Sequence, residues 1–465
     1  MKLTYEQVEE KLRRTEDVLA RALEEIARLH EKIAKLEDQL KRNSKNSSKP
    51  PSTDNKSNTS DANQKSPRGS RMGRARLSFA PDKIDKHVQC MQDNCPYCGS
   101  SKIQLSGQLP EVLQQAELPE IKAIITEYQL QKYRCKGCGK NSTAPLPLGV
   151  PDSAFGPKLM GLLATLTGVL HVAKREAIQL IKDLYDVDMG IGSVPNIEAR
   201  VAAALDPIYD RIHKFVIQHK FCTYFDETGW RDRGKRHFVW LATCQHAAVY
   251  RIDRHRSTAA FQRLIGQETW KAPAVTDRYA VYNAFKDHQF CLAHLIREFK
   301  AYGEREGPDK TMGLALEHEL RLSCRIHREY REGKIPLAQR NRRLRVRKRR
   351  VEYWLEDGLA NGSDALAKIC GVLLEDFEKL WTFTRITGME PTNNIAERDL
   401  RKIVIWRKKS YGTRSDRGKK FVERITTVAQ TIRKQSGNAL RFIQRAVECF
   451  YSRTLPPLIS EAMGF

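Results

Sequence analysis

The sequence predicts a multidomain α/β protein, and three observations lead to this prediction. Residues 1–42 repeat in sevens, and residues 86–148 hold two pairs of closely spaced cysteines. Near residue 220 the hydrophobic pattern changes from a helical to an alternating period. At 465 residues the chain is long enough for more than one hydrophobic core.

Residues 1–42 are predicted to form a coiled coil. Leu19 and Ile26 occupy one core position of the heptad, Leu29 and Leu36 the other, and Glu, Lys and Arg fill the flanks. This spacing keeps one apolar seam facing a partner helix, so we expect self-association as a dimer or higher oligomer. The alternative is a single amphipathic helix packed on its own globule.

Residues 43–85 are rich in Ser, Asn, Lys and Pro and contain few apolar residues. They cannot bury a core and are predicted to form a disordered basic linker, which favours the coiled coil as a detached unit. The chain as a whole carries a net charge of +25, concentrated here and in two later stretches. Such charge favours a nucleic-acid partner over the alternative of solvated helix faces.

Residues 86–148 are predicted to form a small zinc ribbon. Cys95 and Cys98 form one C-x-x-C pair, Cys135 and Cys138 form another, and a glycine follows each pair. Two such knuckles supply the four thiolates of a closed tetrahedral zinc site. Alternating apolar residues at 124–128 are expected to form a strand of the ribbon. Cys90 does not match the spacing and is left out.

Residues 152–215 are predicted to be helical, with helices at 156–170, 174–184 and 193–212. The last two could form a DNA-reading helix-turn-helix or an ordinary part of a helical bundle. No apolar run reaches the length of a membrane span, and the N-terminus lacks a signal-peptide pattern. We therefore expect a cytoplasmic, nucleoid-associated protein without a membrane partner.

Residues 220–435 are predicted to form a ribonuclease H-like core. The expected order is three strands in hairpin succession, then helix, strand, helix and strand, at 221–226, 237–243, 247–252, 257–265, 272–277, 279–285 and 289–291. In that fold the first and fourth strands are neighbours. Asp226 would close the first and Asp277 the fourth, so both would lie at adjacent carboxyl ends.

A helical insertion is expected at about 295–385, followed by a helix that carries Glu397. Residues 436–465 are predicted to form a helical C-terminal tail. Asp226, Asp277 and Glu397 are the candidate catalytic residues, because carboxylates can hold two divalent ions, Mg²⁺ or Mn²⁺, for phosphodiester chemistry. Taken singly, the aspartates could be strand-end caps, and Glu397 could form a capping box with Asn394.

Basic residues near these acids are the candidates for DNA contacts. They lie in the Arg-rich run of the insertion, on the Glu397 helix and directly after it: Arg343, Arg347, Arg349, Arg398, Arg401, Arg407, Lys408 and Lys409.

The ordered set of motifs resembles the DDE transposases of the insertion-sequence sixty-six family. The zipper, the linker motif at 45–51, the cysteine pairs and four short motifs carry the resemblance: Asp-Glu-Thr-Gly at 226–229, Asp-Arg-Tyr-Ala-Val-Tyr at 277–282, Cys-Leu-Ala-His at 291–294 and Thr-Asn-Asn-Ile-Ala-Glu-Arg at 392–398. Two departures are Lys402, where a proline is expected, and Tyr411-Gly412-Thr413, which replaces a Phe-Ala-Gly-like stretch.

The resemblance implies that Asp226, Asp277 and Glu397 are a metal-binding catalytic triad. It also implies binding to terminal inverted repeats, strand cleavage, transfer of 3′ ends into target DNA, and small accessory proteins of the same element. The alternatives are a DNA-binding protein that no longer cuts and a metal-dependent nuclease without strand transfer. For Cys291 and His294 we expect a core cysteine and a helix-capping histidine rather than a second metal site.

Overall fold

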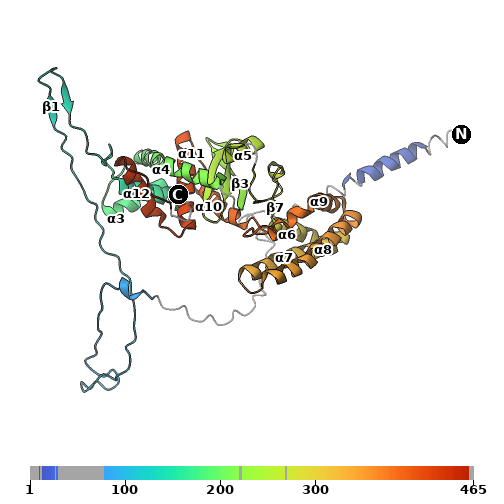
Figure 1. Cartoon of the computed structure of the whole chain (residues 1–465), viewed down its shortest axis with the longest axis horizontal. Helices are drawn as coiled ribbons and strands as arrows, with labels where there is room; N and C mark the ends of the chain where they lie inside the picture. The colour runs from blue at the N-terminus through green and yellow to red at the C-terminus, as the bar shows by residue number, and fades with distance from the viewer. Residues whose placement is uncertain are drawn as a thin grey trace, which may run out of the picture. The chain divides into compact units, whose positions relative to one another are not determined.

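The computed structural model describes residues 10, 13–26, 28–29, 78–218, 222–267 and 270–459. The chain divides into two compact units, Lys56–Ile124 and the remainder, Met1–Asn55 with Ile125–Phe465 (Figure 1). Residues 13–26 are helical, and Leu19 and Ile26 are 59% and 49% exposed. The rest of the predicted coiled coil lies largely outside the described residues, as does the predicted linker up to residue 77. The end of that linker forms a short 3-10 helix, η3 (Pro81–Lys83).

The predicted ribbon contains one two-stranded antiparallel sheet, β1 (Lys132–Arg134) with β2 (Asn141–Thr143). The strand predicted at 124–128 is wrong, because these residues have no regular secondary structure. Ile124 and Ile125 are 93% and 84% exposed, so no hydrophobic core covers these side chains and stabilises a strand here.

Three helices follow: α2 (Pro157–Gly168), α3 (Lys174–Tyr185) and α4 (Ser193–Gln218). The first packs against α12 (Ala439–Tyr451), so the predicted C-terminal tail is helical at 439–451 and this helix is part of the helical core. Long α4 packs against α11 (Asp416–Lys434) and buries an apolar residue on nearly every turn. The predicted helices are confirmed, although α4 extends six residues beyond its predicted end at 212.

The central sheet has five strands: β3 (Thr223–Asp232), β4 (Lys235–Thr243), β5 (Ala248–Asp253), β6 (Ala274–Thr276) and β7 (His288–Phe290). Its order is β5-β4-β3-β6-β7, with β3 parallel to β6 and antiparallel to β4. The prediction that the first and fourth strands of this segment are neighbours is therefore confirmed. Helix α5 (Thr258–Ile265) packs on β4.

Two local predictions within this segment are wrong. Strand β3 does not end at Asp226 but continues to Asp232, because its far half pairs with β4 through a tight turn at Arg233 and Gly234. The helix predicted at 279–285 is only a 3-10 turn, η4 (Ala280–Tyr282).

The predicted insertion is helical, as expected. It contains α6 (Leu292–Gly303), α7 (Pro308–Arg331), α8 (Leu337–Asn361) and α9 (Asp364–Glu375), which pack in sequence order. Two 3-10 turns, η5 (Phe377–Leu380) and η6 (Thr382–Thr384), contact β7 and return the chain to the sheet.

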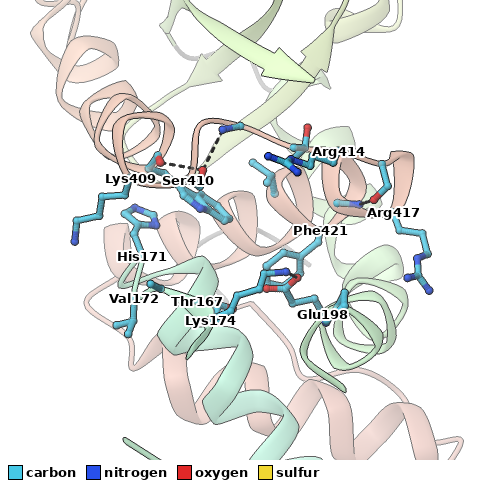
Figure 2. Close-up of a pocket in the computed structure, with 18 of the residues that line it drawn as sticks. Thr167, His171, Val172, Lys174, Glu198, Lys409, Ser410, Arg414, Arg417 and Phe421 are labelled. Atoms are coloured by element: carbon cyan, nitrogen blue, oxygen red, sulfur yellow. Dashed lines mark hydrogen bonds and ion pairs between the residues drawn. The ribbon is translucent and has the colours of Figure 1, made fainter. Parts of the chain in front are cut away.

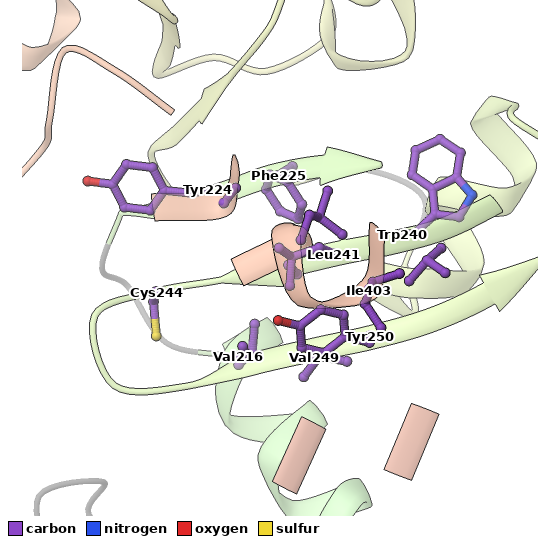
Figure 3. Close-up of a cluster of buried hydrophobic side chains, with 14 of the residues drawn as sticks. Val216, Tyr224, Phe225, Trp240, Leu241, Cys244, Val249, Tyr250 and Ile403 are labelled. Atoms are coloured by element: carbon purple, nitrogen blue, oxygen red, sulfur yellow. The ribbon is translucent and has the colours of Figure 1, made fainter. Parts of the chain in front are cut away.

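Helix α10 (Asn394–Ser410) lies across β3 and β4. Ile403 of α10 packs among buried side chains of the sheet, which include Leu241 and Tyr250 (Figure 3). Strand pairing sets Asp226 opposite Leu241, and Leu241 opposite Tyr250, whose hydroxyl donates to the Asp399 carbonyl of α10. Directly paired residues share a face of a sheet, so the Asp226 side chain is on the side that α10 covers.

Candidate active site

The three candidate acids converge from separate elements. Asp226 lies in β3, Asp277 directly follows β6, and Glu397 is in the first turn of α10. The parallel register pairs Thr223 with Ala274 and Tyr224 with Val275. Continued for two residues, it brings Asp226 level with Asp277. The site therefore forms where β6 stops and β3 continues.

The pKa of Asp226 reflects the proximity of the other acids. Burial raises the pKa of Asp226 well above its ordinary value, and the negative charges of Glu227, Asp277 and Glu397 raise it further. A hydrogen bond from the Glu227 N–H to Asp226 Oδ1, at 2.8 Å, opposes this shift. The clustered carboxylates repel one another, and a bound cation would relieve this repulsion.

A fourth acid, Glu227, is held by its own partners. Its side chain is 3% exposed and forms an ion pair with Arg256 at 2.5 Å. The hydroxyl of Tyr282 donates to its other carboxylate oxygen at 2.5 Å. Arg256 lies over the ring of Tyr279, whose N–H donates to Asp277 Oδ1 at 3.0 Å. Glu227 thus joins β3 to the turn that carries Asp277.

Asn393 connects α10 to the sheet beside Asp226. Its side chain is buried and donates through Nδ2 to the Phe225 carbonyl at 2.7 Å. Its backbone N–H donates to Cys291 Sγ at 3.0 Å. These bonds fix the start of α10 against β3, and Glu397 lies one turn further along that helix.

The Glu397 carboxylate faces helix α6. It lies 3.1 Å from Arg297 Nη2 and 3.6 Å from His294 Nδ1. These contacts argue against a capping box, in which the carboxylate would turn back to its own helix start. The expectation that His294 caps a helix is also wrong, because its ring points to Glu397 from within α6.

Ligand atoms of Cys291, His294 and Glu397 lie within 4.8 Å of one another. Burial raises the pKa of the Cys291 thiol to about 12, so it remains protonated near neutral pH. Cys291 is 1% exposed, and its sulfur already accepts the Asn393 N–H. Cys291 therefore fits the core role expected for it.

Asp226, Asp277 and Glu397 offer carboxylate oxygens of the kind that hard divalent cations prefer, whereas the compact group of possible ligands among the described residues is Cys291, His294 and Glu397. Carboxylate oxygens are the preferred ligands of Mg²⁺ and Mn²⁺, and burial together with the neighbouring carboxylates raises the pKa of Asp226. We conclude that the residues present suit such an ion.

The predicted DNA-contacting arginines of α8 differ in their surroundings. Arg343 forms an ion pair with Glu329 at 2.7 Å, and Arg347 forms one with the buried Glu319 at 2.9 Å, both acids being on α7. Arg349 is exposed and, within the described residues, forms no ion pair. The first two arginines thus bind α8 to α7, and Arg349 remains available.

The basic residues of α10 also divide into two groups. Arg398, Arg401, Lys408 and Lys409 are exposed. Arg407 is half-buried and donates to the Gly229 carbonyl of β3. Burial lowers the pKa of Arg407, with nearby Arg231 adding to the effect. Arg407 therefore holds α10 on the sheet.

The two cysteine pairs adopt the same local geometry. The N–H of Gly99 donates to the Cys95 carbonyl at 2.8 Å, and that of Gly139 to the Cys135 carbonyl at 2.9 Å. Both glycines have a left-handed backbone, with φ of 70° and 72°. Backbone N–H groups within each knuckle lower the pKa of Cys95 and of Cys135, which favours the thiolate that zinc binds.

Among the residues that support the site, Glu227, Arg256, Asn393 and Asp399 were not predicted in these roles from the sequence. The sequence contained an indication for Glu227, since it directly follows Asp226 and a buried acid at that position needs a partner. Asp399 is buried on α10 and binds Lys434 at 2.8 Å and the Thr243 hydroxyl at 2.8 Å. Its partners come from distant parts of the chain, which the sequence pattern does not connect.

Across the part of the chain that the structure describes, no helix combines the length and apolar character that a membrane span requires.

Comparison with known proteins identifies the family. A model described as "Transposase IS66 family" matches residues 152–421, and one for the "zinc-finger binding domain of transposase IS66" matches residues 92–139. A "Family of unknown function (DUF6444)" matches residues 4–77.

A relative from Methanobrevibacter smithii, "Insertion element ISM1 uncharacterized 48.3 kDa protein", is 23% identical over 262 residues. The match covers 52% of this chain and 57% of the relative, so the chain spans just over half of that protein's length. With more than half of its residues matched by the first family model, this chain belongs to the IS66 family of transposases.

Proposed function

We propose that this protein is a DNA transposase in which Asp226, Asp277 and Glu397 hold divalent metal ions, Mg²⁺ or Mn²⁺. The observation that carries the proposal is the convergence of three carboxylates from β3, the end of β6 and α10, where burial and the charges of Glu227, Asp277 and Glu397 raise the pKa of Asp226. The strand order β5-β4-β3-β6-β7 supports a ribonuclease H-like core.

When bound, two such ions activate the attacking oxygen and stabilise the leaving oxygen of a phosphodiester. The chain's own residues orient the ligands. Asn393 fixes the start of α10 against β3, and Tyr279 holds Asp277 by a backbone hydrogen bond of 3.0 Å. Arg297 and His294 hold Glu397 from the α6 side.

The proposed substrates are the terminal inverted repeats of an insertion sequence and a target DNA. Exposed cations near the site support this, among them Arg398 and Arg401 on α10. We further propose that Cys95, Cys98, Cys135 and Cys138 bind one structural Zn²⁺, that residues 1–42 pair as a coiled coil, and that small accessory proteins of the element assist a nucleoid-associated reaction. The zinc-finger family match supports the zinc.

The experiment incubates the full chain with a labelled duplex that carries the ends flanking its own gene, with and without Mg²⁺. We expect Mg²⁺-dependent cleavage at the end and, with target DNA present, a joined product. Asp226→Asn should abolish cleavage and keep DNA binding, whereas Asp210→Asn, an exposed aspartate of α4, should behave as wild type.

Cleavage without joining would favour the nuclease alternative. Binding without any cleavage by the wild type would favour a non-catalytic DNA-binding protein. Cleavage retained by Asp226→Asn would contradict the proposed triad.

A further inference from the structure

A pocket of about 800 Å³ lies between helices α2 to α4 and the turn that joins α10 to α11 (Figure 2). Asp226, Asp277 and Glu397 are not among the residues that line it. Its size is in the range of small-ligand sites, about 300–1,000 Å³. It is therefore a second candidate binding site in this chain.

One side of the pocket is aromatic. His171 stacks on Trp406 with ring centroids 4.8 Å apart and planes 23° apart, and Trp406 meets Phe421 edge to face. Burial lowers the pKa of His171 to about 4, helped by the positive charges of Lys409, Lys402 and Arg433. At neutral pH the imidazole is uncharged, and with Val172 it adds to an apolar wall.

Basic side chains also line the pocket, Lys409 beside His171 among them (Figure 2). Four cations line it, Lys174, Lys409, Arg414 and Arg417, against two carboxylates, Glu176 and Glu198. The buried Glu198 is already paired with Lys174 at 2.7 Å. Among the described residues, Lys409 and Arg414 form no ion pair, and both are exposed. The N-terminus of α11, beside Arg414, adds a positive end of a helix dipole.

The rim of the pocket is held in place by the sheet. Thr413 accepts a hydrogen bond from Trp230 Nε1 at 3.2 Å and donates one to Asp232 at 2.8 Å. Gly412 has a φ of 98°, and a Cβ there would lie 2.0 Å from the Arg231 carbonyl oxygen. The turn is thus preformed.

We infer that this pocket takes one unpaired nucleotide of the DNA substrate, with its base against the His171 and Val172 wall and its phosphate against Lys409 and Arg414. A site that bound only the phosphates of duplex DNA would need a basic surface but no pocket lined by aromatic rings. An unpaired base presents a flat apolar face, which proteins bind by stacking on aromatic rings.

The position of the pocket suits this role. Trp406 lies nine residues after Glu397 on the same helix, about 14 Å along its axis. A strand whose reacting phosphate is at the acids can thus place a nearby unpaired nucleotide in the pocket. The inference rests on the proposed function in one respect, that the substrate is DNA.

The test compares two duplexes in buffer without divalent metal, by fluorescence anisotropy with the full chain. One is blunt, and the other has the same paired sequence with two unpaired nucleotides at one end. We expect the second to bind about fivefold or more tightly, the gain of stacking one base. Lys409→Ala and Arg414→Ala combined with His171→Ala should abolish this preference, because the base loses its stacking wall and its phosphate loses its cations.

The matched control removes the same charge elsewhere, by Arg441→Ala with Arg453→Ala, two exposed arginines outside the pocket. It should weaken both duplexes alike and keep their ratio. Equal affinity of the wild type for the two duplexes would overturn the inference, as would a preference that survives in the pocket variant. A deoxynucleoside monophosphate that competes as well as the overhang would instead assign the pocket to free nucleotides.

The assay needs no cleavage, so its failure leaves the metal site of the proposed function untouched. Conversely, a chain that prefers the overhang and never cleaves would support the pocket and contradict only the catalytic proposal.

Discussion

At the scale of single residues, the proposed chemistry depends on how precisely Glu397 is held against Asp226. Asn393 provides this connection through its bond of 2.7 Å to the Phe225 carbonyl. It is a positioning residue, because it contacts the backbone next to a candidate ligand and not the substrate.

Asn393→Ala should therefore slow cleavage much more than it weakens DNA binding. A misplacement of about 1 Å at a reacting centre costs on the order of 100-fold in rate. The neighbouring Asn394 is exposed, so Asn394→Ala is the matched control. Single-turnover cleavage rates and DNA affinities of both variants provide the check. Equal rates for the two variants would contradict the positioning role.

His288 should make the fold sensitive to acid. It is fully buried in β7 and bonded to the Thr276 hydroxyl at 2.7 Å, and burial lowers its pKa from 6.5 to about 3, with Lys379 adding to the effect. The folded state thus disfavours the proton that the unfolded state accepts. The contribution of His288 to stability is present above pH 6.5 and is lost as the pH falls toward about 3.

Urea unfolding at several pH values measures this effect. Over that window His288→Gln should reduce the slope of unfolding free energy against pH by up to about 1.4 kcal/mol per pH unit. The exposed His318→Gln is the control and should keep the wild-type slope. An unchanged slope in His288→Gln would show that this histidine does not titrate as the fold requires.

At the scale of elements, the Arg-rich helix α8 has arginines of two kinds only two positions apart, one that packs on α7 and one that is exposed. Arg347 pairs with Glu319, whose side chain is 5% exposed, whereas Arg349 is exposed. Charge counting treats both as DNA contacts, and only the packing of α8 on α7 separates them.

Arg347→Ala should lower the free energy of unfolding by about 2 kcal/mol, because it leaves a buried carboxylate with only Arg350 as partner. Arg349→Ala should change stability by less than about 0.5 kcal/mol. It should instead reduce the slope of log affinity against log salt by about 1, the loss of one phosphate contact. Denaturation and DNA titrations at several salt concentrations check both variants. A stability loss in Arg349→Ala and a reduced salt slope in Arg347→Ala would contradict the prediction.

The same scale shows what the sequence could predict. The alternation of apolar residues identified β3, β4 and β5, since each buries side chains against a helix, α10 or α5 for β3 and β4 and α11 for β5. Alternation at 124–128 misled, because no layer covers those residues. The end of β3 was also missed. The strand continues past Asp226 to the turn at Gly234, and the residues of this extension are mostly polar.

For the candidate site, the sequence identified the acids by type and by their place in the strand order. It could not identify Asn393, Arg256 or Asp399 as their supports. Those roles depend on contacts such as Asp399 with Lys434, which only the folded chain brings together.

At the scale of the whole molecule, self-association should depend on the N-terminal helix. Leu19, Ile26 and Leu29, which occupy core positions of the heptad, are between 48% and 59% exposed in the single chain. Such a seam is stable in water only when a partner covers it. Light scattering should therefore show a dimer or higher oligomer for the full chain and a smaller assembly after removal of residues 1–42. If both proteins contained the same number of chains per assembly, the coiled coil would be contradicted.

The central claim is that Asp226, Asp277 and Glu397 together bind divalent metal. Manganese binding to the full chain, followed by electron paramagnetic resonance, measures this most directly, since Mn²⁺ prefers carboxylate oxygen to thiolate. We predict up to two bound Mn²⁺ per chain, with binding sharply weakened by Asp226→Asn and unaffected by Asp210→Asn. Manganese binding that is the same in the wild type and in Asp226→Asn would contradict the account.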